Sequence, residues 1–141
     1  MRDSDEEERL TVLIVDDVAD IRAGYRSILE EGGYRVLDVE TGEQALRLIA
    51  DKRVHLALID LFMPGSMDGI GLIDAIVDMR PPKPAIIAMS GAPHRAYRSS
   101  LQSAKYMGAD QTLQKPIEPG VLVTAVRTLI GGGPALLNHS G

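Results

Sequence analysis

Short, mostly apolar runs alternate with helical patterns along most of this chain. Five runs have the length of strands, at residues 12–15, 36–39, 54–59, 84–89 and 111–114. Four are bounded by turn residues, and several are too apolar to leave one face in water. That pattern is typical of strands buried on both faces of a parallel sheet. The last run, QTLQ, is polar, and we expect it at an edge of the sheet.

The segments between the first three runs carry apolar residues at helical spacing. In the first segment we expect Asp20 to be the N-cap and Gly32-Gly33 to end the helix. A capping box from Thr41 to Gln44 predicts the start of the second helix. The predicted apolar faces of these two helices consist of Ile21, Tyr25, Ile28, Leu29, Ala45, Leu46 and Ile49.

Three further helices follow in the sequence. The third should end before Pro81-Pro82, the fourth covers about 94–107 and ends at Gly108, and the fifth begins at Pro119. The apolar residues of the third and fifth are Ile70, Ile73, Ile76, Val77, Val121, Leu122, Ala125, Val126 and Leu129. The order is (βα)5, an α/β fold whose right-handed crossovers place helices on both faces of a parallel sheet. Ligands bind such sheets beyond the carboxyl ends of the strands.

Length and composition narrow the possibilities. The 141 residues fit one domain, which we expect at 10–130, after a flexible acidic leader at 1–9 and before a flexible glycine-rich tail or linker stub at 131–141. The net charge of −5 argues against a nucleic-acid surface. The apolar runs are shorter than the ~20 residues that a membrane span needs. The chain has no cysteine, which excludes thiolate metal sites and fits a reducing cytoplasm.

Polar side chains end four of the five predicted strands. Asp16 and Asp17 follow the first strand, Asp60 the third, Ser90 the fourth and Lys115 the fifth. In a parallel sheet these side chains meet at one edge, where three carboxylates repel one another unless a cation intervenes. Mg²⁺ takes carboxylate and water oxygens, and a carboxylate can also accept a phosphoryl group. We therefore predict Asp60 as the phosphoryl acceptor, the other two carboxylates as metal ligands, and Ser90 and Lys115 as partners of the phosphoryl oxygens.

The motifs LIVDD, LIDLFMPGSMDG, MSG and QKP occur in this order. Together they resemble two-component response-regulator receiver domains of the chemotaxis-regulator kind over about residues 10–130. The resemblance implies a flavodoxin-like, doubly wound sheet with strand order 2-1-3-4-5. It also implies that Mg²⁺ (or Mn²⁺) is bound by Asp17 and Asp60, by Asp16 directly or through water, and by the backbone carbonyl of Phe62. A cis peptide bond between Lys115 and Pro116 is a further implication.

The resemblance also implies a function. A sensor histidine kinase or histidine phosphotransfer protein would phosphorylate Asp60 in the cytoplasm, and the face formed by helix 4, strand 5 and helix 5 would shift toward a downstream protein target. Such a module contacts neither nucleic acid nor membrane directly. It is no enzyme in the usual sense, because it catalyses only its own phosphorylation and dephosphorylation.

One departure from the family and one alternative remain. The family usually carries an aromatic switch residue three positions before the lysine, where this chain has Thr112. We hypothesise that Tyr106 or the start of the fourth helix relays the signal instead.

The alternative function is that of a Mg²⁺-dependent aspartyl-phosphate phosphatase of the haloacid-dehalogenase type. In that group the nucleophile leads the chain in an Asp-x-Asp pattern, whereas here Val18 follows the acidic pair, which precedes the acceptor.

Overall fold

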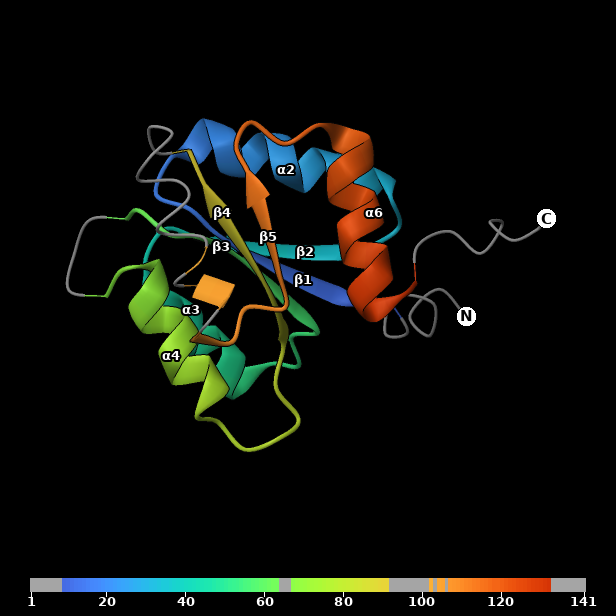
Figure 1. Ribbon diagram of the computed structural model, residues 1–141. Helices are drawn as coiled ribbons and strands as arrows, with labels where there is room; N and C mark the ends of the chain where they lie inside the picture. The colour runs from blue at the N-terminus through green and yellow to red at the C-terminus, as the bar shows by residue number, and fades with distance from the viewer. Residues whose placement is uncertain (1–8, 64–66, 92–101, 103, 106, 133–141) are drawn as a thin grey trace.

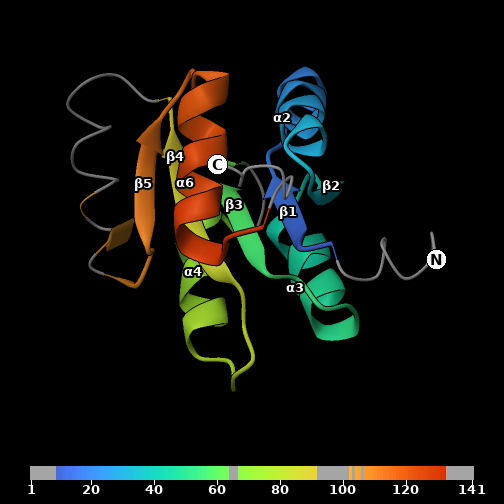
Figure 2. The same cartoon turned by 90° about the vertical axis from the view of Figure 1, so that its right-hand side faces the viewer.

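Five parallel strands form one sheet in the order β2-β1-β3-β4-β5, between two layers of helices (Figure 1). The computed structural model describes residues 9–63, 67–91, 102, 104–105 and 107–132. The predicted fold and strand order are confirmed, and β5 lies at an edge as expected. The order across the sheet, from β5 to β2, can be followed in Figure 2. The strands are β1 (Thr11–Val15), β2 (Arg35–Val39), β3 (Leu56–Asp60), β4 (Ala85–Ser90) and β5 (Gln111–Gln114).

Helices cover both faces of the sheet. They are α2 (Ala19–Glu31), α3 (Gly42–Asp51), α4 (Gly69–Val77) and α6 (Pro119–Ile130). Of these, α2 and α6 lie on one face and α3 and α4 on the other. Most of the helix predicted at 94–107 lies outside the described residues, as do the leader up to residue 8 and the tail from residue 133. Gln102, Ala104, Lys105 and Met107 are helical, and Gly108 follows them at φ +122°.

Side chains of the strands alternate between two buried apolar clusters. Leu13, Ala57 and Ile59 point to the side of α3 and α4. Their neighbours Ile14 and Leu58 point to the side of α2 and α6. Because successive side chains in a strand face opposite ways, a strand covered on both sides must be apolar throughout. This confirms the prediction of burial on both faces for β1, β3 and β4, whereas β2 is only partly buried.

The helix starts agree with the sequence in one case and not in another. The Thr41 capping box of α3 is present, with both of its hydrogen bonds to Gln44. The prediction of Asp20 as the N-cap of α2 is wrong, because Val18 is the N-cap and Asp20 lies in the first turn. The carboxylate of Asp16 accepts a hydrogen bond from the Val18 amide (2.9 Å), so this strand-end residue shapes the entry to the helix. A carboxylate in the first turn still interacts favourably with the helix dipole.

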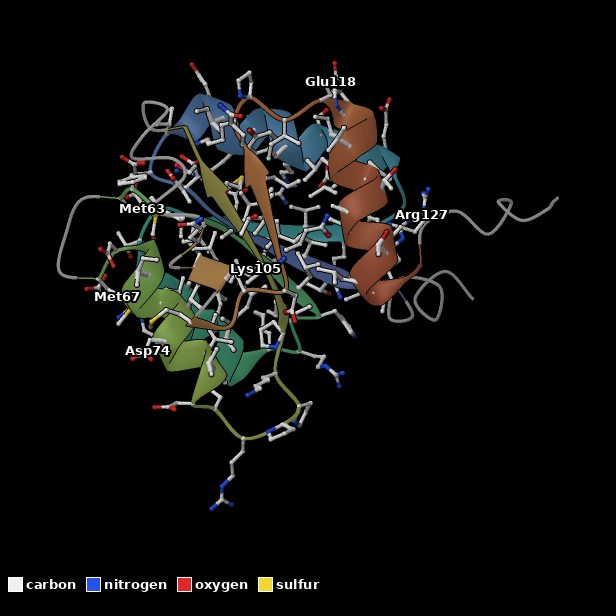
Figure 3. The ribbon with its side chains drawn as sticks, viewed as in Figure 1. Met63, Met67, Asp74, Lys105, Glu118 and Arg127 are labelled. Atoms are coloured by element: carbon white, nitrogen blue, oxygen red, sulfur yellow. The ribbon has the colours of Figure 1, made fainter. Side chains whose placement is uncertain are left out.

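The apolar faces of α4 and α6 also differ in detail from the prediction. Val77 and Val121 are exposed, whereas Leu72, which the prediction omitted, is fully buried. Val77 is the last residue of α4, and its side chain lies beside Gly108. Met63 is buried and Met67 partly buried at the two ends of the loop that leads into α4, where both pack into the apolar cluster on that side (Figure 3).

Gly69 lets the first turn of α4 lie directly on the chain that leaves β3. A Cβ atom at this position would lie 2.3 Å from the carbonyl oxygen of Asp60 and 2.6 Å from the Cα of Leu61. Both are backbone atoms and cannot swing aside, so the helix would have to shift. Gly69 therefore holds the backbone next to Asp60 in place.

We expect Gly69→Ala to lower the free energy of unfolding by about 1–3 kcal/mol, the usual cost of overpacking. Gly24→Ala is the matched control, because Gly24 lies within α2 with no atom within 4 Å of the added methyl group. Alanine should stabilise that helix by about 0.5–1 kcal/mol. Urea unfolding of the two variants measures both effects, and a loss in Gly24→Ala as large as in Gly69→Ala would contradict the explanation.

Candidate functional site at the carboxyl edge of the sheet

The carboxyl ends of four strands bring the predicted site residues together. Asp16 follows β1, Asp60 and Ser90 are the last residues of β3 and β4, and Lys115 follows β5. The register of the paired strands fixes where these residues lie along the strand direction. Ser90 is opposite Gln114, and the Lys115 amide donates to the Ser90 carbonyl oxygen (2.9 Å). Side chains separated by up to 99 positions in sequence are therefore in direct contact.

Three carboxylates form the centre of the site. Asp16, Asp17 and Asp60 each offer an oxygen, and these oxygens lie within 4.8 Å of one another. Asp16 is fully buried and Asp60 is 5% exposed, while Asp17 is more open to solvent. The set has the chemistry of a site for a hard divalent cation, which binds oxygen ligands and keeps some of its waters. The open side at Asp17 leaves room for such waters.

Lys115 is the cation of this cluster. Its Nζ donates to Asp16 Oδ2 at 2.7 Å and lies 3.5 Å from Asp60 Oδ2. Burial alone would lower the pKa of Lys115, but the hydrogen bond to Asp16 and the charges of Asp60 and Asp16 outweigh it, so the pKa is raised. Lys115 is therefore an ammonium ion at neutral pH, and it interacts mainly with Asp16.

Asp60 is the less well compensated carboxylate. Burial raises its pKa above the ordinary value, and the nearby charge of Asp16 adds to the rise. The Phe62 amide, which donates to Asp60 Oδ1 at 3.1 Å, and the Lys115 ammonium offset only part of this. The ionised form of Asp60 is thus costly in the folded protein until more positive charge arrives.

Arg22 supports the backbone of the acidic pair from α2. Its Nη1 donates to the Asp16 carbonyl oxygen (2.8 Å), and its Nε forms an ion pair with Asp38 Oδ1 (3.0 Å). The second oxygen of Asp38 is bound by Arg26. The sequence analysis missed this network. The signal was Asp38 itself, a carboxylate inside the otherwise apolar run VLDV.

The remaining predicted residues lie around this centre. Ser90 is fully buried, and the side chain of Phe62 is about half exposed (49%) at the rim of the site. The Lys115–Pro116 bond is cis, in agreement with the expectation. Thr112 pairs with Ala88 and so lies on the α3 and α4 side of the sheet. The residues expected to replace the aromatic switch, Tyr106 and the start of the fourth helix, lie outside the described residues.

Comparison with known proteins identifies the family. The family model of the response regulator receiver domain matches residues 12–127. The chain belongs to this family. As a receiver domain of two-component signalling, it belongs to a class whose members interact with kinases and downstream effectors.

Individual relatives agree with this assignment. The receiver domain is 30% identical over 126 residues to a probable chemotaxis protein CheY of Rhizobium etli, covering 88% of this chain and 95% of that protein. It is 34% identical over 119 residues to a putative NtrX-like response regulator of Rickettsia bellii, covering 84% of this chain. The chain spans only 24% of the length of that NtrX-like relative.

A solved structure shows the same fold. The crystal structure of a putative response regulator from Chloroflexus aurantiacus superposes with a TM-score of 0.80 at 27% identity, covering 89% of this chain and all of that one. Within the described part of the receiver domain, no helix has the length and apolar character needed to cross a membrane.

We expect Asp60→Asn to stabilise the metal-free receiver domain at neutral pH. Because the pKa of Asp60 is raised on folding, the folded state favours the protonated form, and stability is lost as pH rises through that folded pKa. Asparagine removes the charge, so the gain in stability of Asp60→Asn over the wild type should be present at pH 7 and vanish below the ordinary Asp pKa of about 3.9. Thermal unfolding in EDTA against pH measures this, with the exposed Asp74→Asn as the control. An advantage that does not change with pH would contradict it.

We expect Arg22→Ala to weaken both the fold and the metal site. Removing the bond to the Asp16 carbonyl and the ion pair with Asp38 should lower the free energy of unfolding by about 1.5–3 kcal/mol. The Mg²⁺ concentration for half-maximal stabilisation should rise about tenfold, as for other outer-shell partners.

Arg26→Ala is the matched control for Arg22→Ala. Arg26 binds the same Asp38 and has no hydrogen bond to Asp16, and its side chain is 41% exposed. Its loss should cost less than about 1 kcal/mol and leave the Mg²⁺ dependence unchanged. Equal Mg²⁺ dependences in the two variants would show that Arg22 does not support the site.

Proposed function

We propose that Asp60 accepts a phosphoryl group from a phosphohistidine of a sensor histidine kinase or a histidine phosphotransfer protein, in a reaction that depends on Mg²⁺ or Mn²⁺. The observation that carries the proposal is the contact between a buried carboxylate, two further carboxylates and one ammonium at the carboxyl edge of the sheet. Asp16, Asp17, Asp60 and the carbonyl of Phe62 would hold the metal. The cytoplasmic location expected from the sequence stays a prediction.

Asp60 supplies the nucleophile in this reaction. A carboxylate oxygen forms a bond to phosphorus while the bond from phosphorus to the donor imidazole nitrogen breaks, and the electron pair leaves with that nitrogen. The Phe62 amide holds Oδ1 of Asp60 at 3.1 Å, which orients the carboxylate. When bound, Mg²⁺ supplies positive charge that lowers the repulsion between the carboxylates and the incoming phosphoryl oxygens.

Lys115 and Ser90 would bind the transferred group. Lys115 Nζ already lies 3.5 Å from Asp60 Oδ2, so a small movement away from Asp16 brings it to a phosphoryl oxygen. Ser90 lies at the end of β4, next to Asp60 at the end of β3, and its hydroxyl would bind a second oxygen. Phosphoryl transfer depends mostly on position and charge stabilisation, and these groups supply both.

Phosphorylation would act on a partner protein by changing the conformation of one face of the domain. In this proposal the domain catalyses only the phosphorylation of Asp60 and the slow hydrolysis of the resulting aspartyl phosphate to Asp60 and inorganic phosphate, and it acts on no other phosphate ester. Movement of Ser90 and Lys115 toward the phosphoryl group would shift the face formed by the fourth predicted helix, β5 and α6. A downstream protein would bind that face. Thr112 replaces the usual aromatic of this face, and the relay through Tyr106 remains a hypothesis.

Phosphorylation with a small phosphodonor tests the proposal. With acetyl phosphate and Mg²⁺, we expect the intact mass of the wild type to rise by one phosphoryl group and that of Asp60→Asn to stay unchanged. Asp74→Asn is the control, because Asp74 is an exposed carboxylate on α4 (Figure 3) and does not belong to the acidic cluster. It should be phosphorylated like the wild type.

Two results would overturn the proposal. One is a wild type that gains no phosphoryl group in donor excess. The other is rapid, repeated hydrolysis of a generic phosphate ester, which would favour the haloacid-dehalogenase type of phosphatase instead. Omitting Mg²⁺ should abolish the mass gain of the wild type, because the three carboxylates then lack their counter-charge.

A further inference from the structure

A second concave site lies at the opposite end of the sheet from Asp60. It is a cleft of about 470 Å³ at the amino ends of β1 and β2, beside the end of α3. Thr11 and Leu37 contribute to its wall from the two strands. All strands run from this end toward the acidic site (Figure 1). A strand of five residues such as β1 spans about 17 Å, so the two sites share no residue.

The cleft is lined by positive charge. Among the residues that the structure describes, four cationic side chains and no carboxylate border it, in a chain whose net charge is −5. The four are Arg9, Arg35, Lys52 and Arg53. None of them forms an ion pair in the part of the chain that the structure describes, where the ion pairs involve other arginines and Lys115.

The end of a helix explains only part of this charge. Lys52 and Arg53 directly follow α3, where cations interact favourably with the helix dipole. Arg9 and Arg35 come from the starts of β1 and β2, and no helix end accounts for them. Four like charges around one concavity repel one another, and this repulsion is relieved when an anion enters.

His55 adds an uncharged hydrogen-bond donor to the lining. The backbone amide of Thr11 donates to its Nδ1 at 3.0 Å, so the proton of the neutral ring is on Nε2. Burial and the charge of Arg53 lower the pKa of His55, which keeps the ring neutral at neutral pH. The imidazole therefore offers an N–H group to a ligand without adding to the repulsion between the cations.

We propose that this cleft binds a phosphorylated small molecule of nucleotide size, with its phosphate groups on the arginines and its less polar part against Leu37. Guanidinium groups pair with phosphate through two parallel hydrogen bonds, and Arg35 and Arg53 provide two such groups from different elements. The volume lies in the range of small-molecule sites. The site is independent of phosphorylation at Asp60.

Titration with ATP tests this proposal. We use the ¹⁵N-labelled full chain in EDTA, so that no divalent cation links ATP to the acidic site. We expect saturable shifts of backbone amide signals around Thr11, Arg35 and Lys52 to His55. The signals of Asp17 and Lys115 should stay in place.

Two arginine variants, each of which removes one positive charge, distinguish ATP binding in the cleft from nonspecific electrostatic attraction to the protein. Arg35→Ala should weaken ATP binding about tenfold, the effect of losing one charge-assisted phosphate contact. Arg47→Ala is the matched control, because Arg47 is exposed on α3 and does not line the cleft. It should bind ATP like the wild type. Phosphorylation by acetyl phosphate and Mg²⁺ should be unchanged in both variants.

The acidic leader could compete for the same cations, since five carboxylates lie among residues 1–8. The titration is therefore repeated on a variant in which these five residues are replaced by Ser or Asn. No saturable binding in either protein at about 1 mM ATP would overturn the proposal, as would equal losses in Arg35→Ala and Arg47→Ala. Shifts centred on Lys115 instead of the cleft would overturn it too.

Discussion

Three carboxylates and one ammonium at the carboxyl edge of the sheet are the constraint on which the rest of the structure depends. Lys115 binds Asp16 at 2.7 Å, and Asp60 remains with partial compensation from a longer contact and one backbone amide. Any positive charge that comes close to this buried carboxylate would stabilise its ionised form. The folded domain therefore keeps Asp60 in a state that a bound cation would stabilise, at a cost to its own stability.

Neighbouring backbone holds these charges in place. The first turn of α4 lies on the carbonyl of Asp60 because Gly69 has no side chain. Arg22 connects the Asp16 carbonyl to Asp38 at the end of β2, and the Lys115 amide is bound to Ser90. Each link joins two elements of the sheet or its helices. The positions of the reactive groups therefore depend on the packing of the whole domain.

The two ends of the sheet differ in charge. Acidic side chains and Lys115 form the carboxyl end, whereas the cleft at the amino end is lined by cations and a neutral imidazole. A net charge of −5 describes neither end. For this domain, the local arrangement of charge is more informative about ligands than the sum over the chain.

The sequence by itself determined the strands, their burial on both faces and the strand-end residues, because these follow from local periodicity and from the direction of parallel strands. It predicted Asp16, Asp17, Asp60, Ser90 and Lys115 at one edge, where the structure places them. Only the tertiary structure decided that Lys115 binds mainly Asp16, that Arg22 supports the pair, and that Val18 rather than Asp20 caps α2. It alone gathered Arg9, Arg35 and Lys52 into one cleft. These features join residues from separate elements, and no periodicity along the chain encodes the distance between them.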